Sequence, residues 1–230
     1  MEWTNIILLL VAGLNFGMAL LIWLRNPKHK INILFALAVL STGLWSMAEA
    51  MFREAPTRDL AFLWAKLENT LGSLIIIFFF LFTIYFPYQS KRFNFAAKTL
   101  IVVSVVVLYL MIWLKLHVVG VILQEPNNDF ILSGWGRTYY TLFMMVYLGI
   151  AYYLLLVKYF IVEGIFRKTL FNVLFATGIF ASFGSVFGVI FPLIYGRNNP
   201  WHAPVFSLPM IVILAWFLLL GDKKISIKPR

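Results

Sequence analysis

The sequence predicts an all-α membrane protein built as a bundle of seven transmembrane helices. Hydrophobic residues make up 62% of the 230 positions, and charged residues make up only 12%. A water-soluble domain of this size could not cover so much apolar side chain, so lipid must be the main solvent. Apolar runs of about 20 residues, the length that crosses a bilayer as a helix, recur along the chain and are separated by short polar segments.

The apolar runs are bounded by charged residues or proline, and no long polar linker separates them. The first run has no basic segment before it and is too long for the apolar part of a signal peptide, so it counts as a helix. We expect one domain, 1–230, without a soluble appendage. Its seven predicted helices span residues 5–24, 31–52, 60–86, 97–116, 139–160, 170–195 and 205–220.

Basic residues are concentrated in alternate loops, which predicts the orientation of the bundle. Lys and Arg side chains are retained on the cytoplasmic side when a membrane protein inserts. Segments 25–30, 91–98, 158–168 and 223–230 together hold 13 of the 19 Lys and Arg residues. We therefore predict that the N-terminus is outside and the C-terminus cytoplasmic. The net charge of +10 follows from this topology, and no nucleic-acid partner is expected.

The longest outer segment, residues 117–136, lies between the fourth and fifth predicted helices. It begins with a β-branched run, HVVGVIL, continues through the turn-forming residues EPNND, and ends with FILSGWG. This order favours a small β-hairpin over the outer mouth of the bundle. An irregular loop is the alternative.

Ionisable residues inside the predicted spans are the first candidates for function, because such groups are costly in a membrane. Helical spacing places Trp45, Glu49 and Arg53 on one face of the second helix, and Lys66 and Asn69 near the outer end of the third. The short connection makes these helices antiparallel neighbours, so Glu49 and Lys66 lie at comparable depth and could pair. We predict that these five residues form a ligand-binding cluster, with an internal ion pair between the helices as the alternative.

Small residues predict close helix packing in two places. Gly13 and Gly17 form a GxxxG pair around Asn15, whose amide can bond across a helix contact. A second stripe of small residues runs along the sixth helix and predicts either an internal seam or a dimer face. Its members are Gly178, Ala181, Gly184, Ser185 and Gly188.

Several kinds of chemistry find no support in the sequence. The chain has no cysteine, and the predicted helix 205–220 has no lysine that could hold retinal. The three histidines and three aspartates are scattered over loops and helix ends, so neither a hydrolytic site nor a metal site is predicted. We expect no enzymatic activity, no catalytic residue, no metal and no cofactor. The residues concerned are His29, His117, His202, Asp59, Asp129 and Asp222.

Three stretches of the chain carry a distinctive order of residues. Leu21–Ala50 contains an Arg-Asn-Pro turn, a short basic run, an Asn before Phe-Ala, and a Leu-Trp followed by a Glu four residues after the Trp. Ala61–Pro87 (AFLWAKLENTLGSLIIIFFFLFTIYFP) and Gly188–Tyr195 (GVIFPLIY) follow. These stretches resemble the first inner loop and second helix, the third helix, and the end of the sixth helix of the seven-helix sensor region found at the N-terminus of many bacterial histidine kinases. The other helices match only as hydrophobic spans.

The resemblance implies a multi-pass receptor module in a bacterial or archaeal plasma membrane, surrounded by membrane lipids. Such a module detects an extracellular or lipidic ligand and passes a helix movement to a cytoplasmic signalling domain such as a histidine kinase, often as a homodimer. No kinase domain follows Arg230 in this sequence, so the chain is expected to be either the sensor part of a longer protein or a separate sensor with a signalling partner. A small solute transporter, although no inverted repeat is visible, and a membrane scaffold subunit are the alternatives.

Overall fold

The computed structural model describes residues 2–88, 95–124, 127–187 and 202–212. Six long helices account for most of them: α1 (Trp3–Arg25), α2 (Lys30–Arg53), α3 (Arg58–Tyr85), α4 (Phe95–Trp113), α5 (Gly134–Ile161) and α6 (Gly164–Ser185). A short helix, α8 (His202–Val205), is followed by helical residues 207–212. The predicted end of the sixth helix, with Gly188, and the second half of the predicted seventh helix lie outside the described residues.

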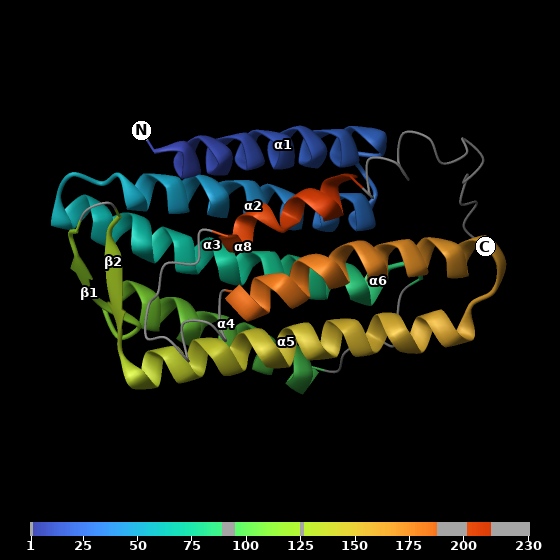
Figure 1. Cartoon of the computed structure of the whole chain (residues 1–230). Helices are drawn as coiled ribbons and strands as arrows, with labels where there is room; N and C mark the ends of the chain where they lie inside the picture. The colour runs from blue at the N-terminus through green and yellow to red at the C-terminus, as the bar shows by residue number, and fades with distance from the viewer. Residues whose placement is uncertain (1, 89–94, 125–126, 188–201, 213–230) are drawn as a thin grey trace.

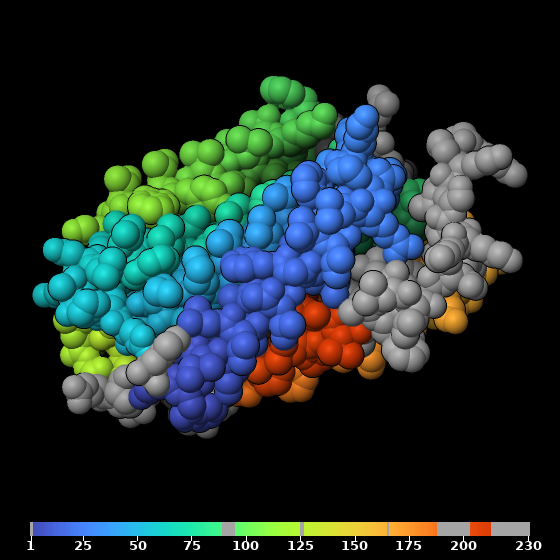
Figure 2. All heavy atoms as spheres, turned by 90° about the horizontal axis from the view of Figure 1, so that it is seen from above, coloured from blue at the N-terminus to red at the C-terminus, as the bar shows by residue number. Residues whose placement is uncertain are grey.

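The long helices pack as neighbours in an order close to their order in the chain. α2 packs against α1 and α3, α3 packs against α5, and α5 packs against α6 (Figure 1). The start of α1, the α2–α3 connection and the two strands lie together at one end, which we call the hairpin end. The α1–α2 and α5–α6 connections lie at the other end, which we call the far end. Figure 2 shows α1, in blue, beside the red residues 202–212.

Two antiparallel strands, β1 (Val118–Ile122) and β2 (Asp129–Leu132), follow α4. Phe130 of β2 packs edge-on against Phe52 of α2, with ring centroids 5.4 Å apart. The Asn128 amide donates to the backbone oxygens of Phe52 and Ala55 at 2.8 and 3.0 Å. These contacts fix the strands to the α2–α3 corner and close a small apolar core there, which is separate from the main core between the helices.

Five described helices, α1 to α5, are long and apolar enough to cross a membrane by length and composition. α4 shows what surrounds them, because only Leu108 and Ile112 of its residues are buried while Leu100 and Val102 are 71% and 61% exposed. A largely apolar helix with so little buried surface fits a lipid environment. The described structure therefore fits an all-α membrane protein.

Two helices begin five or six residues earlier in the chain than predicted. α5 begins at Gly134 instead of residue 139, because the Ser133 hydroxyl accepts a hydrogen bond from the Gly136 N–H at 3.0 Å and caps the helix. α6 begins at Gly164 instead of residue 170. Gly164 has a φ of +62°, a conformation that glycine adopts without strain. Only Val162 and Glu163 therefore join the two helices.

The close contact between α1 and α2 involves a different glycine from those predicted. A Cβ at Gly43 would lie 2.6 Å from the Phe16 ring and 3.1 Å from the Ala12 carbonyl oxygen. Gly13 and Gly17 are exposed, and a Cβ at either would meet nothing within 4 Å. Asn15 does bridge two helices, since its amide donates to the Ser207 hydroxyl at 2.9 Å. A packing role for Gly13 and Gly17 stays a prediction.

Candidate functional site

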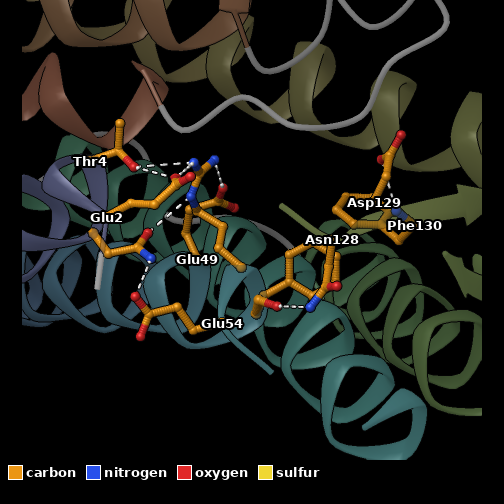
Figure 3. A network of polar contacts seen from close by, with 10 residues as sticks. Glu2, Thr4, Glu49, Glu54, Asn128, Asp129 and Phe130 are labelled. Atoms are coloured by element: carbon orange, nitrogen blue, oxygen red, sulfur yellow. Dashed lines mark hydrogen bonds and ion pairs between the residues drawn. The ribbon is translucent and has the colours of Figure 1, made fainter. Parts of the chain in front are cut away.

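Arg53 is buried at the hairpin end and is the centre of a polar network. Figure 3 labels Glu2, Thr4, Glu49 and Glu54 in this network. The Nε of Arg53 donates to Asn5 Oδ1 at 2.9 Å. Its Nη2 donates to Thr4 Oγ1 at 3.2 Å and pairs with Glu2 Oε2 at 3.3 Å. The Asn5 amide in turn donates to Glu54 Oε1 at 2.8 Å. This network joins the first turn of α1 to the last turn of α2.

Glu49 and Glu68 form a buried pair of carboxyl groups between α2 and α3. Glu49 is 2% exposed and Glu68 is 4% exposed, and the two side chains interact directly. Arg53 Nη1 lies 3.9 Å from Glu49 Oε1, one helical turn along α2. The Trp45 side chain, which also belongs to α2, approaches Glu68 of α3.

Lys66 does not pair with Glu49 as the sequence suggested. Its ammonium instead donates to the Trp113 carbonyl oxygen at 3.0 Å and lies 4.6 Å from the centre of the Phe62 ring. Lys66 and Glu68 are two residues apart, so their side chains leave α3 roughly 200° apart. Because Glu68 faces α2, Lys66 faces α4.

Asn69 connects α3 to the segment that follows α4. Its Oδ1 lies 2.9 Å from His117 Nε2, and its backbone oxygen accepts from the Tyr140 hydroxyl at 3.1 Å. The His117 ring stacks on the Tyr140 ring, with centroids 4.8 Å apart and planes 19° from parallel. His117 precedes β1 and Tyr140 lies in the second turn of α5. The contact therefore joins α3, the strands and α5 at one point.

Burial lowers the pKa of His117 from 6.5 to about 4, so its imidazole is neutral at pH 7. Between pH 4 and 6.5 the unfolded chain therefore binds more protons at this residue than the folded chain. Its contribution to stability is complete above pH 6.5 and decreases by about 3 kcal/mol as the pH falls to 4. We expect His117→Gln to flatten the decrease in thermal unfolding midpoint of the nanodisc-embedded protein between pH 6.5 and 4. His29→Gln, at an exposed position, serves as the control, and an unchanged slope in His117→Gln would contradict this prediction.

A cavity of about 160 Å³ lies beneath the strands, between α2, α3, α5 and α6. Most of its wall is apolar, with residues Phe35, Val39, Ile76, Phe79, Met144 and Leu148. Its polar groups include Trp45, Glu68, Asn69, His117, Arg137 and Tyr140. An apolar chamber with a few polar groups is the usual form of a small-molecule site. Among the described residues, no group of three His, Asp or Glu could hold a metal ion.

The structure places only part of the predicted cluster at this cavity. Trp45 and Asn69 line it, whereas Glu49, Arg53 and Lys66 lie outside its wall. Gly184, predicted for packing, also lines it. The sequence interpretation missed Glu68. It also missed Tyr140, and it missed Arg137, which comes to the cavity through the early start of α5.

Lys158 is a second buried cation, near the far end of α5. It is 3% exposed, although the sequence placed it in a basic cytoplasmic segment. Its three N–H donors are shared among four backbone oxygens at the end of α3: Thr83 at 2.7 Å, Ile84 at 3.1 Å, Phe86 at 2.7 Å and Tyr88 at 2.8 Å. Lys158 thereby satisfies carbonyls that a helix end leaves open and fastens α3 to α5.

Comparison with known proteins gives one match. The family model for the N-terminal 7TM region of histidine kinase matches residues 7–220. No curated protein and no solved structure matches the chain.

Proposed function

The chain belongs to the family formed by the N-terminal 7TM region of histidine kinase, and we propose that it detects its ligand in the cavity beneath β1 and β2. As a member of this family it is a membrane sensory module that signals to a fused or associated kinase. The observation that carries the ligand proposal is a chamber with apolar walls and buried polar groups at the junction of four helices and the strands. The ligand would be extracellular or lipidic, and the chain itself would have no enzymatic activity.

We place the hairpin end outside the cell and the far end in the cytoplasm. The far end holds the basic α1–α2 connection and, around the α5–α6 connection, Arg167 and Lys168. The hairpin end instead holds several carboxylates, among them Glu2, Glu54 and Asp59. This asymmetry supports cytoplasmic retention of the basic loops. In the complete proposed architecture, residues 1–230 form one domain with a seventh helix over 205–220.

The proposed signal is a shift of α5 and α6 relative to α2 and α3. These two helix pairs form opposite walls of the cavity, so a ligand that separates them acts on both. Lys158 joins α3 to α5 at the far end, and α6 follows α5 after only two residues. A change at the cavity would thereby reach the cytoplasmic face, where a kinase domain would respond.

Filling the cavity tests this proposal. A Cβ at Gly184 meets nothing within 4 Å, so Gly184→Leu extends into the chamber without a backbone clash. We expect it to change the autophosphorylation of a histidine kinase core joined after residue 230 by about fivefold or more, the usual size of a coupling between sites. Gly149→Leu, on an exposed face of α5 with equal free space, should leave the rate unchanged.

The two alternatives predict different results in the same membranes. A scaffold subunit needs no chamber, so Gly184→Leu and Gly149→Leu would both leave kinase activity at the level of the unmodified fusion. A solute transporter would lose flux across vesicle membranes in Gly184→Leu without any change in phosphorylation. The homodimer expected for a sensor that drives a dimeric kinase would be tested by crosslinking in native membranes.

A further inference from the structure

The guanidinium of Arg137 is an unbalanced charge beside the cavity. Arg137 lies in the first turn of α5, and its side chain lines the chamber. Its Nη2 is buried and has no hydrogen-bond partner, and no carboxylate among the described residues forms an ion pair with it. A charged N–H group removed from water without a partner is costly, so a site that keeps one there has a use for it.

The other charged groups near the chamber make contacts of their own, none of them with Arg137. Glu68 shares its environment with Glu49, and Arg53 lies 3.9 Å from Glu49. Asp129 of β2 accepts a hydrogen bond from the Phe130 N–H at 2.8 Å. His117 is neutral at pH 7. Arg137 is therefore the cation of this wall that has no ion-pair partner among the described residues.

The rest of the wall accommodates an apolar body. A dry cavity of about 150 Å³ accepts benzene, so a chamber of about 160 Å³ suits a ring or a chain of roughly six to eight carbons. Phe79 and Leu148 belong to its apolar lining, whereas Arg137 follows the strands at the hairpin end. Taken together, the chamber combines an apolar volume with one cation.

We propose that the cavity binds an anionic amphiphile, with its carboxylate or equivalent acid group on Arg137 and its apolar body between α2, α3, α5 and α6. The planar guanidinium can hold a carboxylate through two parallel hydrogen bonds, which are shorter and stronger than neutral ones. The proposal rests on the proposed function, because it takes the chamber as the ligand site and adds the class of ligand. Such a molecule has two sources, a soluble organic acid or an anionic membrane lipid.

Quenching of tryptophan fluorescence by brominated probes tests the proposal, because Trp45 lines the chamber. In nanodiscs of phosphatidylcholine, 8-bromooctanoate should quench the fluorescence of the full chain saturably. Arg137→Gln should weaken its apparent affinity about tenfold or more, the loss expected for a desolvated charge pair. The neutral probe 8-bromooctanol should not distinguish the two proteins. Arg58→Gln, at an exposed position of the same end, is the matched control.

Two further measurements identify the source of the ligand and provide a second variant of Arg137. If phosphatidylglycerol nanodiscs abolish the quenching by 8-bromooctanoate in the unmodified chain, the anionic lipid occupies the site. If quenching persists there, a soluble acid is the ligand. Arg137→Lys, which keeps the charge, should retain part of the affinity and replaces Arg137→Gln should the latter fail to fold.

Equal binding of the acid and the alcohol, or no effect of Arg137→Gln, would overturn the anionic ligand. That result would leave the proposed function standing, since the response of the kinase to Gly184→Leu does not depend on the charge of the ligand. If the Gly184→Leu fusion shows unchanged autophosphorylation but still binds 8-bromooctanoate, the sensory role is contradicted instead.

Discussion

Arg53→Met destabilises the folded chain by about 3–5 kcal/mol, the cost expected when one partner of a buried ion pair is removed. Methionine keeps most of the side-chain volume but supplies no donor. Glu2, Asn5 and Glu49 would each lose a charged partner, and the Glu49–Glu68 pair would keep no balancing cation nearby. α1 and α2 would lose their polar connection at the hairpin end.

The measurement is thermal unfolding in nanodiscs, followed by tryptophan fluorescence. Arg58→Met is the matched control, because Arg58 lies at the exposed start of α3, and its midpoint should stay near that of the unmodified chain. Arg53→Lys should fall between the two, since an ammonium keeps the charge but not the fork of donors that reaches Asn5 and Thr4 together. Equal midpoints for Arg53→Met and Arg58→Met would show that the network contributes nothing to stability.

Lys158→Met is the second large loss, again of about 3–5 kcal/mol, because one buried ammonium satisfies four carbonyl oxygens. Those oxygens belong to the last turn of α3 and the residues beyond it, where no further helical N–H is available. Without the lysine, the end of α3 should fray while its half nearer the hairpin end stays folded.

Hydrogen exchange separates this local effect from general instability. Faster exchange is expected in residues 80–88 of Lys158→Met, with little change at the Arg53 network. Lys168→Met removes an exposed lysine from the start of α6 and should behave like the unmodified chain. Uniform exchange changes along the whole bundle would contradict a local capping role for Lys158.

Hydropathy predicted the first five helices because crossing a membrane is a property of each segment alone. The run 31–52 corresponds to α2 (Lys30–Arg53), and 60–86 to α3 (Arg58–Tyr85). The first residue of a helix was less predictable where it depends on a single capping side chain. Ser133 begins α5 through a cap inside a glycine-rich stretch, where composition indicates a loop.

The site was harder to predict, because it depends on how each helix is rotated about its axis. Glu49 and Arg53 share a face of one helix, so their proximity follows from sequence spacing. Whether Lys66 or Glu68 faces α2 depends on packing between α2 and α3, which an apolar sequence does not specify. His117 and Asn69 are separated by 48 positions and meet only through the fold.

α4 gives these proteins a helix with one face whose sequence is nearly free to drift. At its exposed positions, such as Leu100 and Val102, almost any apolar side chain would meet lipid equally well. Selection there acts on hydrophobicity and length, whereas in α2 and α3 it acts on individual contacts. Distant relatives should therefore be traced through Arg53, Glu68 and Asn69, and an alignment anchored on α4 would record the composition of a membrane segment, not descent.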